Sequence, residues 1–178
     1  MKKVLIIGSP GAGKSTLSYR LRTLLGIKSV HLDCYFWQPG WVKIPRDQLN
    51  EQIALLIKED EWVMDGTYID SLEMRLAAAD TVIFLNYPLW LCLYGVFKRR
   101  ITFAGKFRED MTSGCEEKID WPFLKWVIKF PWTNRLEIIR ILGEHKDKLD
   151  VHIFYTRKET ESYLQALESK MMRGEKSV

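Results

Sequence analysis

Gly8-Ser9-Pro10-Gly11-Ala12-Gly13-Lys14-Ser15 is the stretch that decides the fold, because it matches the phosphate-binding loop pattern G-x-x-x-x-G-K-[ST] at every specified position. Phosphate oxygens are held best by backbone N–H groups that converge on one point, and the three glycines free the loop to arrange them. Lys14 is placed to reach the β- and γ-phosphates of a nucleotide. The Ser15 hydroxyl can ligate Mg²⁺, and Thr16 can add a further phosphate contact.

The flanks of this loop decide whether the match is real. Residues 2–7 form a short apolar run rich in β-branched residues, and the apolar residues after Ser15 recur with the period of one helical face. Strand, glycine loop and helix is the order that the motif requires. The alternative, a glycine-rich turn that happens to contain Lys-Ser, does not account for these flanks.

Strands and helices alternate along the rest of the chain. Further strands are predicted at residues 29–32, 62–64, 81–85 and 151–155. Helices are predicted at residues 15–25, 46–58, 71–79, 89–100, 121–130, 134–142 and 159–169. This alternation predicts an α/β protein with the three-layer P-loop NTPase fold, in which helices cover both faces of a five-stranded parallel sheet. Ligands are expected at the carboxyl ends of the strands.

Length, charge and cysteine content limit the classes of function that the chain could have. A chain of 178 residues suits one domain and is short for a helicase or a transporter ATPase. Its 27 basic and 23 acidic residues give a net charge of +4, which leaves a nucleic-acid partner possible but does not favour one. Three cysteines without paired spacing predict neither a disulfide framework nor a zinc site, and they fit a reducing cytoplasm.

The chain is not expected to have a membrane partner. Its most hydrophobic region, residues 82–97, is broken by Asn86 and Pro88 and is shorter than the roughly 20 apolar residues that a spanning helix needs. We expect a cytoplasmic protein that is a monomer or a dimer.

Two aspartates follow predicted strands and are candidates for the chemistry. Asp65 comes directly after the strand at residues 62–64, which is the place of the carboxylate that holds Mg²⁺ in P-loop proteins. Asp33 ends the strand at residues 29–32 and could accept a proton from an acceptor hydroxyl or contact the metal. The alternatives are an exposed turn aspartate before Gly66 and a cap of the next segment, respectively.

Two further side chains are candidates for acceptor binding. Trp37 belongs to an aromatic cluster at residues 35–41 that could stack on a ring of the acceptor or simply cover the core. Arg75, on the short helix after Asp65, could hold an acceptor phosphate or pair with an acidic neighbour.

Residues 102–120 lose the apolar period and are dense in charge, so we interpret the region of about 101–120 as a mobile helical lid. Arg99, Arg100, Lys106 and Arg108 could swing over the phosphates and neutralise charge in the transition state, and Arg100 and Arg108 are the favoured pair. Such charge runs otherwise form solvated faces. Arg157, after the last strand, could lie over a nucleotide base.

These segments together resemble the nucleoside-monophosphate-kinase-like group of P-loop proteins. More narrowly, the chain is similar to the bacterial family labelled DNA topology modulation proteins. The resemblance is carried by residues 6–16, 31–33, 36–37, 39–41, 62–68, 75–76, 98–100, 108–111, 114–115 and 156–159.

The resemblance implies an adenylate-kinase-like fold in a single domain, with an acceptor-binding region at about residues 34–60 and a lid. It also implies ATP and Mg²⁺ at residues 8–16 and Asp65, with lid arginines over the phosphates. Where adenylate kinases carry Asp-Gly-Phe-Pro-Arg after the third strand, this chain reads Asp-Gly-Thr-Tyr-Ile at residues 65–69. The arginine for the acceptor phosphate is therefore missing unless Arg75 replaces it.

The leading hypothesis is a small-molecule kinase that moves the γ-phosphate of ATP to a nucleotide, a nucleoside or a similar hydroxyl-bearing metabolite. Lys14, Asp33, Arg100 and Arg108 are its predicted catalytic residues. The alternative is a nucleotide-dependent regulatory protein that contacts DNA, with little kinase activity. Its support is a basic and aromatic region that contains Lys98, Arg99, Arg100, Trp121, Lys125 and Trp126.

Overall fold

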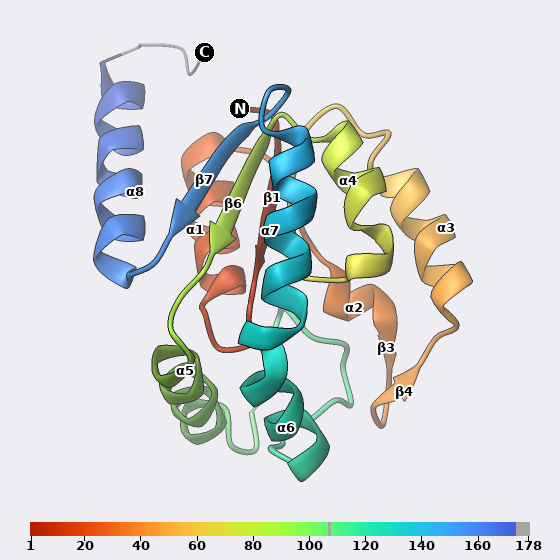
Figure 1. Ribbon diagram of the computed structural model, residues 1–178. Coiled ribbons are helices and arrows are strands. Elements are labelled where there is room, and N and C mark those ends of the chain that lie inside the picture. The colour runs from red at the N-terminus through yellow and green to blue at the C-terminus, as the bar shows by residue number, and fades with distance from the viewer. Residues whose placement is uncertain (107, 174–178) are drawn as a thin grey trace.

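A central parallel sheet organises the computed structural model, which describes residues 1–106 and 108–173 (Figure 1). Its strands run in the order β2-β5-β1-β6-β7. They are β1 (Lys3–Gly8), β2 (Ser29–His31), β5 (Trp62–Asp65), β6 (Thr81–Leu85) and β7 (Asp150–Phe154). Helices cover both faces of this sheet, so the predicted α/β fold class is confirmed.

The core explains why these segments are strands. Residues 4–7 and 82–84 are fully buried, because helices lie on both sides of the sheet. Successive side chains of β1 enter two different clusters. Leu5 and Ile7 pack with α3 (Arg46–Leu56), α4 (Leu72–Ala78) and α7 (Asn134–His145). Val4 and Ile6 pack with α1 (Lys14–Leu25) and α8 (Arg157–Met172).

The strand register brings the predicted site residues to one edge. Ile6 is level with Asp65 of β5, and Gly8 is level with Leu85 of β6. The carboxyl ends of the strands therefore meet below the sheet in Figure 1. There the remaining helices gather, α2 (Leu32–Phe36), α5 (Leu89–Thr102) and α6 (Trp121–Lys129).

Three local features differ from the prediction. Asp33 lies in the first turn of α2 rather than at the end of a strand. Residues expected to form a loop make a small hairpin of β3 (Trp37–Gln38) and β4 (Val42–Lys43), whose turn places Gly40 and Trp41 at positive φ. The chain also forms two short 3₁₀ helices. The first, η1 (Ile69–Ser71), directly precedes α4, and the second, η2 (Phe130–Trp132), directly follows α6.

The segment between α5 and α6 contains turns rather than helix over its described residues, so the helical part of the predicted lid ends at Thr102. This segment is docked on the hairpin. Gly40 N–H donates to Gly114 O at 3.0 Å, and Trp41 Nε1 donates to Glu116 O at 3.0 Å. Thr112 Oγ1 donates to Trp37 O at 2.6 Å. The predicted lid and acceptor region therefore contact one another directly.

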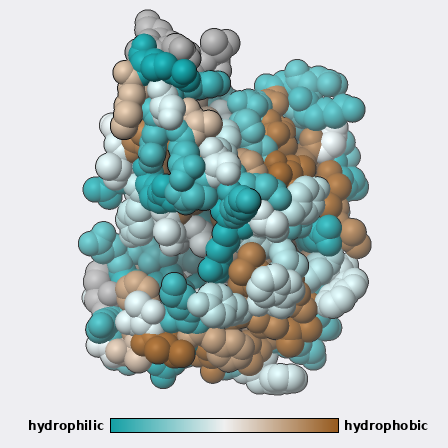
Figure 2. Space-filling model, turned by 90° about the vertical axis from the view of Figure 1, so that its left-hand side faces the viewer, coloured by the Kyte–Doolittle hydropathy of each residue, from teal (hydrophilic) through white to brown (hydrophobic). Residues whose placement is uncertain are grey.

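The outer side of α5 is apolar. Its large exposed apolar side chains are Trp90, Tyr94, Phe97 and Ile101. Figure 2 shows apolar side chains gathered along the lower edge of the molecule, below a mostly hydrophilic surface. Within the described residues, α5 and every other helix fall short of the length and apolar character needed to cross a membrane.

Candidate active site

The loop between β1 and α1 has the backbone conformation that its glycines allow. Gly8, Gly11 and Gly13 have φ values of 149°, 77° and 96°, and all three lie where side chains are disfavoured. Lys14 begins α1, and its Nζ donates to Gly8 O at 3.0 Å and Ser9 O at 3.1 Å. The lysine thus folds back over a loop at a helix N-terminus, a position suited to phosphate binding.

Two glycines bring α5 against this loop. A Cβ on Gly95 would lie 2.0 Å from Gly11 O, and a Cβ on Gly11 would lie 2.2 Å from Cys92 O. Only glycine fits at this crossing, because backbone atoms cannot move aside as a flexible side chain can. The sequence analysis missed this contact, since Gly95 is an isolated glycine within a helical pattern.

Thr67 ties the loop to the end of β5. Its Oγ1 accepts from Gly8 N–H at 2.9 Å and donates to Gly8 O at 2.6 Å. Asp65, 4% exposed, lies just before it at the strand end. The same strand therefore fixes both the loop and the candidate metal-binding carboxylate.

Asp65 is paired with a histidine that the sequence analysis did not assign. His31 Nδ1 lies 3.1 Å from Asp65 Oδ1, and both side chains are buried. Burial alone would lower the pKa of His31, but the hydrogen bond and charge of Asp65 outweigh it and raise the pKa. Asp65 Oδ2 has no hydrogen-bond partner among the described residues. An unpartnered buried carboxylate oxygen on a residue that interacts with Lys14 fits the donor set that Mg²⁺ prefers.

Asp33 lies next to these groups. Tyr68 OH donates to Asp33 Oδ1 at 2.5 Å. Burial raises the pKa of Asp33, and the negative charge of Asp65 adds to this effect, while Tyr68 and Lys14 oppose it. Lys14 in turn has a pKa lowered by burial, against the attraction of Asp65 and Asp33. The lysine and the two aspartates therefore form one interacting charge group.

Arg99 interacts with this group, and Arg108 lies beside Arg99. The charge of Arg99 acts on both Lys14 and Asp33. Arg108 is 8% exposed and binds Asp110 through Nε at 3.0 Å and Nη2 at 2.5 Å. Arg100 is exposed on α5 and is not brought to the group. The geometry therefore favours Arg99 as the cation of α5 that acts at the site, whereas Arg100 was favoured from the sequence.

Asp110 connects the lid segment to the phosphate-binding loop. Burial would raise its pKa, but hydrogen bonds from Arg108 and from the Ser15 hydroxyl lower it overall. Ser15 is the residue expected to ligate Mg²⁺. The lid segment therefore reaches the donor side of the candidate site in this structure.

The two predicted acceptor-binding residues have other partners. Arg75 is fully buried and donates to the carbonyls of Gly66 (Nη1, 2.7 Å), Tyr68 (Nη2, 2.5 Å) and Ser71 (Nε, 3.3 Å). Burial lowers its pKa to about 9. Arg75 thus supports the turn after β5 through all three guanidinium nitrogens, and its acceptor-phosphate role stays a prediction.

Trp37 packs edge-on against Phe36 and Trp41, with centroids 4.9 and 5.2 Å away. Lys43 Nζ lies 5.6 Å from its ring. The side chain is half-buried, so part of the ring is available to an acceptor, and its predicted stacking role is untested.

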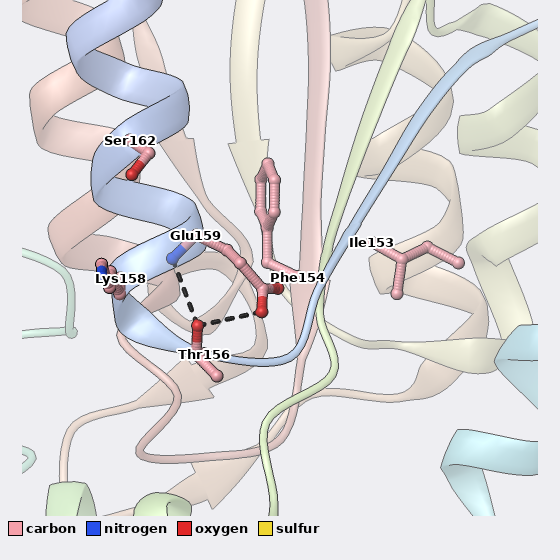
Figure 3. Close-up of a pocket in the computed structure, with 6 residues that line it drawn as sticks. All are labelled: Ile153, Phe154, Thr156, Lys158, Glu159 and Ser162. Carbon is pink, nitrogen blue, oxygen red and sulfur yellow. Dashed lines mark hydrogen bonds between the residues drawn. The ribbon is translucent and has the colours of Figure 1, made fainter.

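Arg157 is exposed at the start of α8, with its guanidinium 5.4 Å from the ring of Tyr94 on α5. Beside it is an open hollow of about 520 Å³ (Figure 3). It is lined by Ile153, Phe154, Thr156, Lys158, Glu159 and Ser162. The role of Arg157 in covering a nucleotide base stays a prediction.

The hollow itself is not the candidate catalytic centre. Thr156 and Glu159 form a reciprocal cap, in which Thr156 Oγ1 accepts from Glu159 N–H at 3.2 Å and donates to Glu159 Oε1 at 3.0 Å (Figure 3). Their polar groups are therefore satisfied without a ligand. The hollow also lies beside β7, two strands from the loop that follows β1.

Comparisons with known proteins were made for sequence and for structure. No family model matches the chain. A stretch of 61 residues, 34% of this chain, is 39% identical to the "Pentafunctional AROM polypeptide" of Candida tropicalis and spans 3% of that polypeptide. "Uncharacterized protein YqaC" of Bacillus subtilis is 25% identical over 148 residues, which is 81% of each chain.

The similar solved structures include two shikimate kinases. One, from Acinetobacter baumannii in complex with shikimate, has a TM-score of 0.53 and 14% identity, and the match covers 99% of this chain and 96% of that one. The other, from Bacteroides thetaiotaomicron, has a TM-score of 0.50 and 17% identity and covers 95% and 97%. This chain therefore has the same P-loop α/β fold as these two shikimate kinases.

Proposed function

We propose that this chain is a kinase that transfers the γ-phosphate of ATP to a hydroxyl of a small metabolite. The observation that carries the proposal is the position of Asp33, whose carboxylate interacts electrostatically with Lys14, Asp65 and Arg99. A loop that only binds a nucleotide has no need of such a carboxylate, whereas a hydroxyl acceptor needs a group that takes its proton. The fold shared with shikimate kinases supports the proposal.

On the donor side, backbone N–H groups within residues 11–16 bind the phosphates of ATP. Lys14 exchanges its two carbonyl partners, Gly8 O and Ser9 O, for phosphate oxygens. Ser15 and Asp65 would hold Mg²⁺, and the ion would supply positive charge that neutralises the phosphates of ATP. His31 fixes the rotamer of Asp65 through its Nδ1, so the unpartnered Oδ2 points away from the histidine.

On the acceptor side, Asp33 is the proton acceptor. Tyr68 holds its Oδ1, and no hydrogen bond among the described residues engages Oδ2. As the acceptor oxygen attacks the γ-phosphorus, its proton passes to Asp33, and the bond from that phosphorus to the β-phosphate oxygen breaks. The raised pKa of Asp33 brings it closer to the pH at which it works, which favours this transfer.

The proposed acceptor carries a hydroxyl rather than a phosphate at the reacting position. A phosphate acceptor needs a free cation, and all three nitrogens of Arg75 are engaged by carbonyls. Trp37 and the hairpin are proposed to contact the ring of the acceptor. Shikimate, which the Acinetobacter baumannii structure contains, belongs in any panel of candidates.

Arg99 and Arg108 are proposed to stabilise charge on the transferring phosphoryl group, together with Lys14. Arg99 interacts with both sides of the site, Lys14 on the donor side and Asp33 on the acceptor side. Positive charge at this point stabilises the equatorial oxygens of the transferring group.

The second candidate function is DNA contact, as the resemblance to the DNA topology modulation proteins suggests. The observation that favours it is the exposure of Trp121 and Trp126, at 70% and 42%, beside Lys125 on α6. Indole rings can stack on unpaired bases, and lysines can contact phosphates. Such binding would weaken steeply with salt, because each neutralised phosphate releases counterions.

The experiment measures ADP release and acceptor phosphorylation over a panel of hydroxyl-bearing metabolites. We expect acceptor-dependent turnover by the wild type and loss of turnover in Lys14→Ala. Lys28→Ala replaces an exposed lysine between α1 and β2; this variant is the matched control and should be unaffected. Turnover no higher than that of Lys14→Ala over the whole panel would refute the kinase, and salt-sensitive DNA binding would then favour the second candidate.

A further inference from the structure

Glu117 is a buried carboxylate between two cations, and nothing in the sequence patterns marks it. It lies in the segment between α5 and α6, and its side chain is 1% exposed. Its Oε1 accepts from Arg99 Nε at 2.8 Å, and its Oε2 accepts from Arg108 Nη1. One carboxylate thus uses both oxygens to bridge an arginine of α5 and an arginine of the lid segment.

The two guanidinium groups need such a bridge to stay side by side. Burial lowers the pKa of Arg99, and the positive charge of Arg108 lowers it further, while Glu117 opposes both effects. Arg99 also lies 5.8 Å from the ring of Phe123 on α6, and Arg108 lies 5.9 Å from that of Phe103. Aromatic rings therefore limit the directions in which the two cations can move.

Arg99 is the cation whose direction matters for phosphoryl transfer. Its charge acts on Lys14 and on Asp33, and it follows by one helical turn Gly95, which packs against Gly11 of the phosphate-binding loop. Glu117 engages its Nε, and no hydrogen bond among the described residues uses either terminal nitrogen. A guanidinium held by Nε keeps its rigid fork of terminal N–H donors available for phosphate oxygens.

We propose that Glu117 is a positioning residue, which bridges Arg99 and Arg108 and aims the terminal nitrogens of Arg99 at the transferring phosphoryl group. This inference rests on the proposed kinase function. Glu117 itself touches neither nucleotide nor acceptor. The competing interpretation is a latch, in which Glu117 withholds the two arginines from the phosphates.

The test compares Glu117→Gln with Glu116→Gln, the exposed neighbour, whose side chain is not part of the bridge. If Glu117 positions Arg99, Glu117→Gln should lower kcat at least tenfold and leave the KM for ATP within about threefold. The KM should change little because ATP binding in the ground state depends mainly on the phosphate-binding loop. Glu117→Asp keeps the charge and should recover part of the loss. A rise in kcat would establish the latch and overturn the proposal, as would kcat values equal to that of Glu116→Gln.

A second measurement does not require the acceptor to be known. ADP with aluminium fluoride mimics the transferring phosphoryl group, and its affinity relative to ADP alone is measured by calorimetry. We expect Glu117→Gln to lower this ratio at least tenfold, with no further loss when it is added to Arg99→Ala. Equal affinity ratios for Glu117→Gln and wild type would overturn the positioning role of Glu117, even if no acceptor is phosphorylated. A wild type that phosphorylates no acceptor would overturn only the proposed kinase function.

Protein stability is separated from positioning by thermal unfolding. Where Glu117→Gln unfolds below the assay temperature, Glu117→Asp provides the comparison, and it should lower kcat about threefold or more without a change in the KM for ATP. An aspartate variant that is folded and fully active would overturn the proposal, since a shorter side chain cannot reach both arginines in the same geometry.

Discussion

Gly95→Ala should destabilise the protein and weaken ATP binding, although alanine is the better helix former. The added Cβ would lie 2.0 Å from Gly11 O, 2.9 Å from Gly11 C and 3.2 Å from Gly11 Cα, well inside ordinary contact. All three atoms belong to the backbone of the phosphate-binding loop. Either α5 or the loop must therefore shift to admit a methyl group.

The magnitude follows from two opposing effects. Replacing glycine by alanine inside a helix stabilises the folded protein by roughly 1 kcal/mol. Overpacking a tight contact costs about 1–3 kcal/mol, and here the neighbour is rigid backbone. The net expectation is that the free energy of unfolding falls by up to about 2 kcal/mol. The affinity for ATP should fall about tenfold, because the loop N–H groups no longer converge on one point.

The assay pairs denaturant unfolding with calorimetric titration of ATP, and it has a matched control. Gly143, on α7, would place a Cβ in open space, so Gly143→Ala should raise the free energy of unfolding by about 0.5–1 kcal/mol and leave ATP binding unchanged. If Gly95→Ala were as stable as Gly143→Ala and bound ATP like the wild type, the close contact between α5 and the loop would be refuted.

Three further predictions concern single side chains. Asp33→Asn should lower kcat by about 10²–10⁴ with ATP affinity retained, as measured by steady-state kinetics and calorimetry, and an active asparagine variant would exclude Asp33 as the proton acceptor. Arg75→Met should cost about 3 kcal/mol or more in denaturant unfolding, because it leaves the carbonyls of Gly66, Tyr68 and Ser71 without their donor, and a loss below about 1 kcal/mol would contradict this role. Asp80→Asn should cost about 1 kcal/mol at pH 7, a figure kept low because the carboxylate is 42% exposed. Partial burial works to raise the pKa of Asp80, but hydrogen bonds from Thr81 and the N–H groups of Lys3 and Lys2 lower it overall. The folded protein therefore binds fewer protons there than the unfolded chain, so the stability difference between wild type and Asp80→Asn should shrink as the pH falls below about 4, and a difference that stays constant over that range would contradict this.

The donor half of the site could be predicted from sequence because its signals are local. The loop at residues 8–15 is a contiguous motif, and Asp65 directly follows an apolar run that had to be a buried strand. Parallel strands end at a common edge, so placing Asp65 near the loop needed only the fold class. The structure has Asp65 at the end of β5, level with Ile6 of β1.

The lid half could not be predicted in the same way. Arg99 and Arg100 are adjacent on α5, where one residue turns the side chain by about 100°, so the packing of the helix decides which of them reaches the site. That packing depends on the close contact between Gly95 and Gly11, which belong to segments far apart in the sequence. Glu117 and Asp110 lie in irregular backbone, which carries no period to show which side chains turn inward. The pairing of His31 with Asp65 likewise joins two strands whose register only the sheet defines.

Transfer of a labelled γ-phosphate tests the central claim most directly. The wild type is incubated with Mg²⁺, γ-labelled ATP and a small-molecule extract, and the label is followed by chromatography. The account predicts that the label moves from ATP to a phosphorylated hydroxyl compound, and that Lys14→Ala and Asp33→Asn abolish this product while Lys28→Ala keeps it. Label that stays in ATP and inorganic phosphate with the wild type, or the same product with Asp33→Asn, would contradict the account.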